Sequence, residues 1–378
     1  MNVLVWVQHL LGSGHLRRAL SVAEALAAGF APTLASGGPP MPWRAAGVDI
    51  VQLPPLRAAD ERIAGLVDAH GREPTPALWA ERTAILAGLV RRLRPRVVIT
   101  EMFPFGRRAL RQEVLGLLDA AGGLRPRPLV VSSVRDVLVA KTRADRLAEM
   151  RDLALQRFDL VLVHGDPTLF PFARTFVHAD AIADRLVHTG FVLNRLPVPA
   201  AGGQGAVLVS AGGGAVGGGL IEAALAARPL SRLADRRWHL VAGANLPAAQ
   251  WQALVARLPD GVTLERHSHD LPGLMAAAEV SVSQAGYNTV AEGLAGAARM
   301  VLVPFDAPGQ DEQAARAARL RELGLAEMVT AAEMTPAGLA AAIDRAAARP
   351  RPAADGLRFD GALRSAEAIA ERLGRHVG

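Results

Sequence analysis

Short runs of apolar residues, many of them β-branched, alternate with longer stretches rich in alanine and leucine along the chain. Consecutive apolar positions are typical of strands in parallel sheets that helices cover on both faces. The repeated order of strand and helix therefore predicts an α/β protein with two Rossmann-like domains that face a cleft. The expected strands of the first series are Val3–Val7, Thr33–Ala35, Asp49–Gln52, Val97–Thr100, Leu129–Ser132, Leu160–Val163 and Val187–Thr189. Those of the second series are Ala206–Ser210, His239–Ala242, Val262–Glu265, Val280–Ser283, Met300–Val303 and Glu327–Val329.

A segment of prolines followed by glycines separates the two series, and this composition is typical of a linker. The expected division is a first domain over 1–195, a linker over 196–205, a second domain over 206–356 and a final helix over 357–378. The last segment carries an apolar stripe at helical spacing. This pattern leaves open which domain the final helix caps. Segment 39–76, rich in prolines and charges, is expected to be mostly irregular.

Composition narrows the classes of chemistry. The chain contains no cysteine, which excludes disulfides, thiolate nucleophiles and cysteine-ligated metal sites. The first residues lack the basic and small-residue pattern of a signal peptide, so we expect a cytoplasmic protein, peripheral at the inner membrane face if it meets a membrane. The one long uncharged stretch, 201–221, contains nine glycines and is a poor candidate for a membrane span.

The positive charge is concentrated in the first 200 residues, where 25 arginines and lysines face 18 acidic residues. This excess favours an anionic partner, such as a phosphorylated acceptor or an acidic membrane surface. An equally simple reading is that an arginine-rich, lysine-poor composition reflects genomic base bias. Nucleic acid is disfavoured because the charge is dilute and few aromatic residues accompany it.

Each series opens with a strand that runs into a glycine-rich loop and then a helix. Gly12 and Gly14 precede His15 in the first, and Gly212 to Gly214 follow the strand in the second. Such loops let a ligand approach the free N–H groups of a helix start, so both are expected to be anion cradles. A flexible packed turn is the alternative. Arg17 replaces the third glycine of a dinucleotide fingerprint, and no G-K-[ST] follows the second loop, so nicotinamide enzymes and P-loop NTPases are disfavoured.

A third glycine turn carries the most specific signal. Gln284 and Gly286 follow strand Val280–Ser283, Asn288 and Thr289 are expected to cap the next helix, and Glu292 lies one turn inside it. A later strand leads into Asp311-Glu312-Gln313. The two stretches resemble the nucleotide-sugar-binding half of GT-B glycosyltransferases of family 28, and the likeness continues through Leu323-Gly324.

The resemblance implies a role for each matched residue. It implies that Gly286 holds phosphates, that Glu292 bonds the ribose hydroxyls, and that Glu312 and Gln313, beside Gln310 and Asp311, read the donor sugar. The loop with His267 and His269 would lie beside the base; a metal pair there is the minor alternative. The expected donor-binding set is Gly12, Gly14, Gly212, Gly213, Gly214, His269, Gln284, Gly286, Asn288, Thr289, Glu292, Asp311, Glu312 and Gln313.

For the first domain the resemblance implies that His15 serves acceptor or phosphate chemistry, and imidazole can act there as a base. Glu101 and Asp136 follow predicted strands and are alternative bases. Segments Phe103–Arg108 and His164–Pro167 are candidates for the acceptor side, the former for a lipid phosphate, with a simple packed turn as its equal alternative. A core or capping role is the alternative for His15.

The predicted function is transfer of a hexose-type sugar from a UDP-sugar, or another NDP-sugar, to an unidentified small-molecule or lipid-linked acceptor. Helix N-termini would stabilise the leaving diphosphate in place of a metal, and no cofactor is expected. Two alternatives stay open. Residues Gly12–Arg18 also resemble the G-x-G-H-x-x-R opening of UDP-sugar hydrolases, and a non-catalytic nucleotide-sugar-binding protein would carry the same glycine loops.

Overall fold

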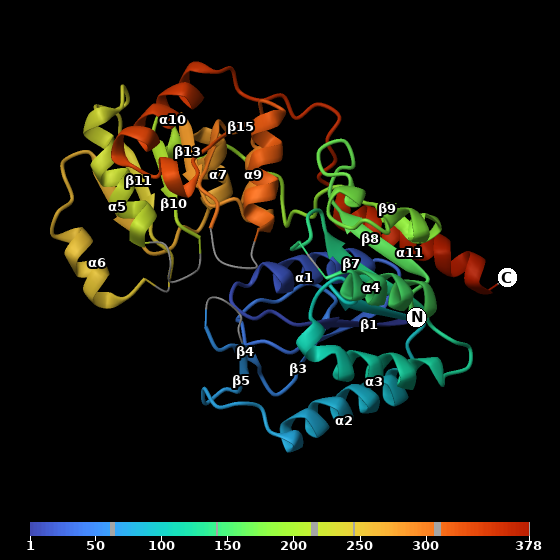
Figure 1. Ribbon diagram of the computed structural model, residues 1–378. Helices are drawn as coiled ribbons and strands as arrows, with labels where there is room; N and C mark the ends of the chain where they lie inside the picture. Colours follow the sequence, from blue (N-terminus) through green and yellow to red (C-terminus); the bar gives the residue numbers. More distant parts are fainter. Residues whose placement is uncertain (61–64, 141–142, 213–217, 245, 306–310, 378) are drawn as a thin grey trace. The chain divides into compact units, whose positions relative to one another are not determined.

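The computed structural model describes residues 1–377 except 61–64, 141–142, 213–217, 245 and 306–310. Its contacts divide the chain into two compact units (Figure 1). Unit 1 is Met1–Asn194 together with Arg358–Gly378, and unit 2 is Arg195–Leu357. The expected final helix is therefore part of unit 1, which settles a point that the sequence left open.

Unit 1 is built on a seven-stranded sheet of parallel strands in the order β3-β2-β1-β6-β7-β8-β9. Its strands are β1 Asn2–Val7, β2 Ala31–Ser36, β3 Asp49–Gln52, β6 Val97–Glu101, β7 Leu129–Arg135, β8 Leu160–His164 and β9 Leu186–His188. Its helices are α1 Gly14–Leu26, α2 Pro76–Leu93, α3 Arg111–Gly122, α4 Ala144–Arg157 and α11 Gly361–Val377. A two-stranded hairpin, β4 Arg57–Ala58 with β5 Leu66–Val67, interrupts the segment that was expected to be irregular.

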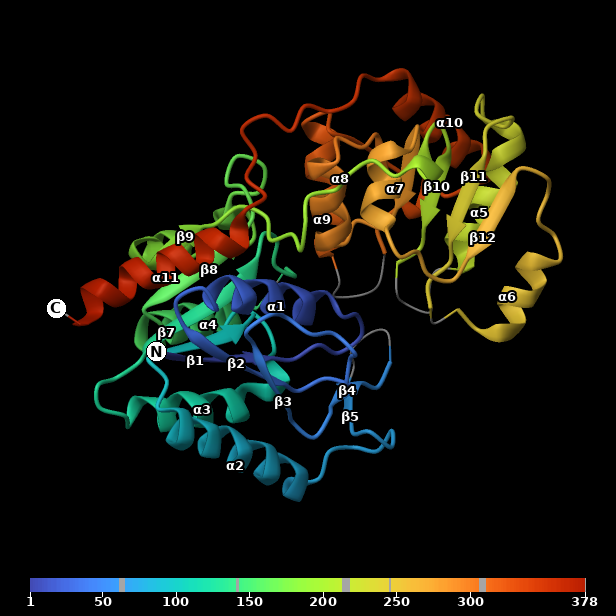
Figure 2. The same cartoon turned by 180° about the vertical axis from the view of Figure 1, so that it is seen from behind.

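The two faces of this sheet bury alternate residues of each strand. In β1, Val3 and Val5 pack in the core that α1 and α11 complete, whereas Leu4 and Trp6 pack in the core under α2 and α3. Figure 2 shows these two helix pairs on opposite faces of the sheet. Because both faces are covered, no polar position interrupts β1, which is why its sequence reads as one apolar run.

Unit 2 has a six-stranded parallel sheet in the order β12-β11-β10-β13-β14-β15. Its strands are β10 Val207–Ser210, β11 Trp238–Val241, β12 Val262–Glu265, β13 Val280–Ser283, β14 Met300–Leu302 and β15 Ala326–Met328. Its helices are α5 Gly218–Ala227, α6 Ala248–Val255, α7 Leu271–Ala277, α8 Tyr287–Ala295, α9 Glu312–Glu322 and α10 Pro336–Ala348. Helices α5 and α10 complete the larger core, and α7 packs on the opposite face. None of the described helices is long and apolar enough to cross a membrane.

In each sheet the first strand of the series lies inside the sheet. The next two strands of the sheet are added on one side of it, and the later strands on the other side. β1 lies between β2 and β6, and β10 lies between β11 and β13. The helices on either side of such a switch point diverge, and ligands of open α/β sheets bind at the carboxyl ends of the strands there. The topology therefore directs attention to the loops after β1 and β6 in unit 1, and after β10 and β13 in unit 2.

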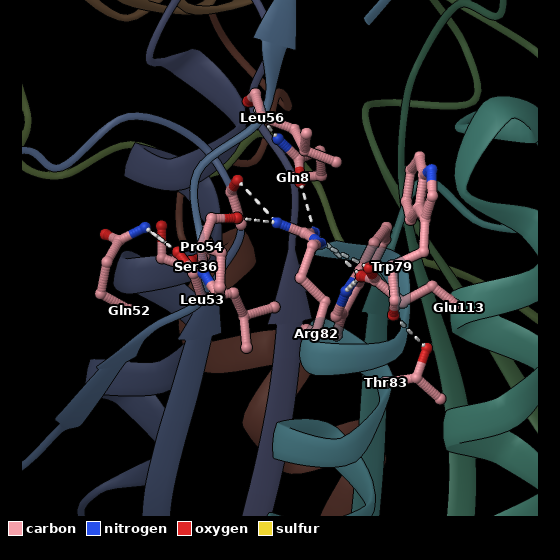
Figure 3. A network of polar contacts seen from close by, with 12 residues as sticks. Gln8, Ser36, Gln52, Leu53, Pro54, Leu56, Trp79, Arg82, Thr83 and Glu113 are labelled. Carbon is pink, nitrogen blue, oxygen red and sulfur yellow. Dashed lines mark hydrogen bonds and ion pairs between the residues drawn. The ribbon is translucent and has the colours of Figure 1, made fainter. Parts of the chain in front are cut away.

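A fully buried ion pair fixes the β1 loop of unit 1 (Figure 3). Arg82 of α2 donates from Nε and Nη2 to the carboxylate of Glu113 in α3, at 2.6 and 3.0 Å, and neither side chain is exposed. Arg82 also donates to Gln8 Oε1 at 3.0 Å and to the carbonyls of Gly37 and Pro54, while Trp6 Nε1 donates to Glu113 at 2.8 Å. Gln8 in turn donates to the Leu56 carbonyl. All five guanidinium hydrogens therefore have acceptors, which is the condition under which burying such a pair is tolerated.

Candidate functional site

The switch point of unit 1 brings His15 and Glu101 together. His15 is the second residue of α1 and Glu101 is the last residue of β6. His15 Nδ1 lies 3.0 Å from Glu101 Oε1, and Arg18 Nη2 donates to the same oxygen. Glu101 is not exposed at all, whereas the His15 side chain keeps 15% of its surface exposed. Only the histidine of this pair can therefore meet a substrate directly.

A second layer of polar side chains lies behind Glu101. Ser133 of β7 donates from Oγ to Glu101 Oε2 at 2.6 Å, and the same Oγ lies 2.9 Å from Nε2 of His164, the last residue of β8. His164 Nδ1 lies 2.9 Å from Thr189 Oγ1, just beyond β9. Ser133, His164 and Thr189 are all at most 3% exposed. The carboxyl ends of four neighbouring strands thus share one buried polar chain that reaches the surface at His15.

His15 lies among positive charges. Burial, followed by the charges of Arg107, Arg135 and Arg18 and then by His9, holds the pKa of His15 well below its ordinary 6.5. Burial also lowers the pKa of His164, to about 3. Both imidazoles are therefore neutral at pH 7, and a neutral ring has one nitrogen that accepts a proton or hydrogen bond.

The other residues predicted for unit 1 differ in accessibility. Gly12 is exposed, and a Cβ added there would meet nothing within 4 Å, while Gly14 is the first residue of α1. Asp136 is 1% exposed, and its Oδ1 accepts from the N–H of Val137. His164 and Asp166 are buried as well, so neither lines the surface as an acceptor pocket would require. Burial also means that Glu101 and Asp136 cannot touch an acceptor without rearrangement.

Segment Phe103–Arg108 forms one wall of a cavity of about 130 Å³. Apolar side chains Phe103, Met150 and Leu153 line it together with four arginines, which are Arg107, Arg108, Arg111 and Arg146. Glu149 is the one acidic residue in the lining, and it pairs with Arg108 and Arg111. The cavity therefore combines apolar side chains with a positively charged lining.

The switch point of unit 2 brings Gly212 and Gln284 together. Gly212 has a φ of +71°, and a Cβ there would lie 3.1 Å from Gln284 Oε1, so this turn requires glycine. Gly286 is the N-cap of α8, and a Cβ there would meet only Thr289 Oγ1, at 3.9 Å. Packing within the protein thus does not explain the glycine at 286. Gly213, Gly214 and Gln310 lie outside the described residues.

Helix α8 presents the predicted donor-binding residues on one half-exposed face. Glu292 lies four positions after Asn288 and three after Thr289, and all three residues are partly exposed, whereas neighbours such as Val290 are buried. The expectation that Asn288 and Thr289 cap the helix is wrong. The helix begins at Tyr287 and Gly286 is its N-cap, without a side-chain bond, so both residues lie inside the first turn.

Side chains of helix α9 bond the backbone at Phe305 and at Ala285. Gln313 Oε1 accepts from the N–H of Phe305 at 3.1 Å, and the buried Arg316 donates to the Ala285 carbonyl at 2.9 Å. Gln313 thus bonds the backbone at Phe305, a contact that the sequence did not predict. Asp311 is exposed and Glu312 half-exposed at the start of the helix.

The exposed rings of His267 and His269 meet edge to face, 5.6 Å between centroids. Within the described ranges, no three histidine, aspartate or glutamate side chains are grouped so that they could hold a metal ion. The two histidines therefore contact each other. In the described ranges, no further histidine or acidic side chain joins them in a group that could hold a metal ion.

Comparisons with known proteins add to this geometry. Residues 208–372 match the glycosyltransferase family 28 C-terminal domain. The UDP-N-acetylglucosamine–N-acetylmuramyl-(pentapeptide) pyrophosphoryl-undecaprenol N-acetylglucosamine transferase of Methylobacterium radiotolerans is 34% identical over 202 residues, which are 49% of this chain and 54% of that protein. The enzyme with the same name from Methylorubrum populi is 38% identical over 108 residues, 28% of this chain and 29% of that protein. The chain is thus aligned with about half of the first relative's length.

Solved structures agree over nearly the whole chain. Acinetobacter baumannii MurG has a TM-score of 0.61 at 18% identity, covering 98% of this chain and all of that one. The calicheamicin glycosyltransferase has a TM-score of 0.60 at 19% identity, covering all of this chain and 95% of that one. At such identities the likeness shows the shared α/β fold with two parallel sheets.

Proposed function

We propose that this chain, a GT-B protein whose residues 208–372 are a glycosyltransferase family 28 C-terminal domain, transfers a sugar from a nucleotide-sugar donor to an acceptor. The observation that carries the proposal is the α8 turn. Gly286 leaves the N-terminus of α8 open, although a methyl group would fit there without a clash. Glu292 lies on the half-exposed face of the same helix, one turn further on. This arrangement suits a diphosphate at the helix start and a sugar hydroxyl beside the carboxylate.

The donor that we propose is a UDP-sugar with a hexose-type sugar, since the named relatives use UDP-N-acetylglucosamine. The N–H groups at the start of α8 would stabilise the charge of the departing diphosphate, so the reaction needs no metal. Glu292 would bond the ribose hydroxyls, and Gln284 and Gly212 would close the other side of the same turn. Glu312 and Asp311 are proposed to reach the sugar.

On the acceptor side we propose that His15 is the general base. With Nδ1–H donating to Glu101, Nε2 is left to take the proton of the acceptor hydroxyl. The acceptor oxygen bonds the sugar carbon as the bond from that carbon to the diphosphate breaks, and the negative Glu101 stabilises the imidazolium that forms. Arg18 and His15 both converge on Oε1, which is why they lie only 3.1 Å apart.

The acceptor is proposed to be anionic, either a small molecule or a lipid-linked one. Arg107 and Arg135 act on His15, and Arg107 also lines the apolar cavity with its neighbouring arginines. The named relatives act on a pyrophosphoryl-undecaprenol acceptor, which has the same combination of negative charge and hydrocarbon.

Incubation with UDP-sugars without any acceptor distinguishes a transferase from a hydrolase. Slow background hydrolysis fits a transferase, whereas rapid complete hydrolysis fits a UDP-sugar hydrolase.

Replacing Glu292 by alanine is expected to weaken UDP-sugar binding about 10- to 100-fold, the range for losing hydrogen bonds to a charged group. Titration calorimetry measures the change. The matched control is Glu222→Ala, an exposed helical glutamate of the same unit, which should bind donor like the parent protein. Equal affinities for the two variants would remove Glu292 from the donor site.

Replacing Gly286 by alanine is expected to change the free energy of unfolding by less than about 1 kcal/mol, because its φ of −65° suits alanine and the methyl group has room. The same methyl would stand over the N–H groups proposed to meet the diphosphate, so donor affinity should fall about tenfold or more. Thermal shift with UDP reports both effects. Gly122→Ala, at an equally open position of α3, is the control. Unchanged UDP binding by Gly286→Ala would contradict the phosphate role.

A further inference from the structure

The buried chain behind Glu101 has one consistent arrangement of hydrogens. Ser133 Oγ lies 2.6 Å from the Glu101 carboxylate, and a carboxylate only accepts, so the single serine hydrogen points there. Ser133 Oγ must then accept from His164 Nε2, 2.9 Å away. The opposite arrangement, in which Ser133 donates to His164, would set oxygen lone pairs against a buried carboxylate at 2.6 Å.

The same reasoning continues to Thr189. Burial keeps His164 neutral at pH 7, so a hydrogen on Nε2 leaves Nδ1 as an acceptor. Thr189 Oγ1 lies 2.9 Å from Nδ1 and is the donor there. The Gly190 carbonyl, 3.0 Å from Thr189 Oγ1, competes for that hydrogen. If Thr189 donated this hydrogen to the Gly190 carbonyl instead, the lone pairs of Thr189 Oγ1 would face the lone pair of His164 Nδ1.

We propose that Thr189, His164 and Ser133 are positioning residues that donate in sequence toward Glu101 and so hold its other oxygen as the acceptor for His15. This inference rests on the proposed role of His15 as base. Glu101 and His164 end β6 and β8, Thr189 follows β9, and Ser133 lies two residues before the end of β7, where it is paired with Glu101; the parallel strands fix this spacing. This series of hydrogen bonds therefore defines the ring orientation and the tautomer of His15, which lies on helix α1.

The first test measures the parent protein. Long-range ¹H–¹⁵N spectra of the chain labelled with ¹⁵N-histidine distinguish the tautomers at pH 7, and His15→Gln and His164→Gln assign the two signals. We expect the Nε2–H tautomer for His164 and the Nδ1–H tautomer for His15. A protonated His164, or the Nδ1–H tautomer at that residue, would overturn the proposal. This readout does not depend on sugar transfer, so it stands even if the chain proves to have another activity.

The second test compares two neighbouring serines of β7. Ser133→Ala removes the donor to Glu101, so this carboxylate should attract the His15 proton more strongly and raise the titration midpoint of His15 by roughly 0.5–1 pH unit. The groups that face His15, which are Arg107, Arg135, Arg18, His9 and Glu101, are unchanged in the variant. Ser132→Ala is the matched control, because its equally buried hydroxyl donates to the Phe103 carbonyl instead. Its His15 midpoint should equal that of the parent protein.

An unmoved or lowered midpoint in Ser133→Ala, or equal shifts in both serine variants, contradicts the proposal. Ser133→Thr keeps the hydroxyl and should restore the parent midpoint. If Ser133→Ala does not fold, Thr189→Val serves in its place. This isosteric change removes the donor to Nδ1, so the ¹⁵N signal of that nitrogen should shift while His164 keeps the Nε2–H tautomer. An unaltered His164 signal in Thr189→Val would equally contradict the proposed series of hydrogen bonds.

Discussion

Replacing Arg82 by methionine is expected to lower the free energy of unfolding by roughly 3–5 kcal/mol, the cost of leaving one member of a buried ion pair without its partner. The variant removes every donor that Arg82 supplies to Glu113, Gln8 and the two backbone carbonyls. Glu113 keeps only its bond from Trp6 among those described above. Urea denaturation followed by fluorescence measures the change in midpoint.

Arg92→Met is the control for this experiment. Arg92 belongs to the same helix α2 but is exposed, so its replacement should cost no more than about 0.5 kcal/mol. The double variant Arg82→Met with Glu113→Leu should recover part of the loss, because it removes the stranded charge as well. A loss below about 1 kcal/mol in Arg82→Met would mean that water or another donor takes over the carboxylate.

The second large effect is expected from His15→Gln, which should lower kcat about 10²- to 10⁴-fold, the usual contribution of a general base. Glutamine keeps a polar side chain at the position but cannot accept the acceptor proton. Steady-state rates with saturating UDP-sugar measure the change. His70→Gln, an exposed histidine of the same unit, should keep parent activity. A kcat within threefold of the parent would remove His15 from the chemistry.

The pH dependence follows from the direction of the His15 shift. Its pKa lies well below 6.5, so His15 is already unprotonated at neutral pH and activity should be lost only as the pH falls below 6.5 and passes through the lowered value. Bound anionic substrate would offset the positive charges of Arg107 and Arg135. The acid limb of kcat should therefore lie at higher pH than that of kcat/KM. Coincident limbs would argue against an anionic group near His15.

The sequence predicted the strands well because their physical signal is local. Strands β3, β12 and β13 have the predicted bounds, and the other expected strands differ by one to three residues at an end. Helices cover both faces of these sheets, so burial produces continuous apolar runs, and their short length and β-branched residues distinguish them from the longer helices rich in alanine and leucine. Hairpin β4–β5 was missed, since two-residue strands carry no periodicity. The helix α11 was expected, but its partner depends on tertiary packing.

The candidate site was only partly predictable, because its contacts join residues far apart in the chain. Glu101 and His164 could be singled out because each ends an apolar run, and His15 because it follows a glycine turn. Ser133 and Thr189 have no such signal on their own. Their relevance depends on the strand order β6-β7-β8-β9, which places four strand ends in one row. Likewise, no local pattern reveals that Arg316 is buried and holds the Ala285 carbonyl.

Because α11 belongs to unit 1, the core of that unit cannot be completed until the end of the chain has been synthesised. Ile369 and Leu373 complete the core that Val3 and Leu16 begin, yet they are synthesised after all of unit 2. At about 5–20 residues per second, the nascent first sheet waits on the order of ten seconds or more for its last cover. Unit 2 is continuous in the sequence and is complete before α11 is synthesised, so its core can form before unit 1 receives its last helix.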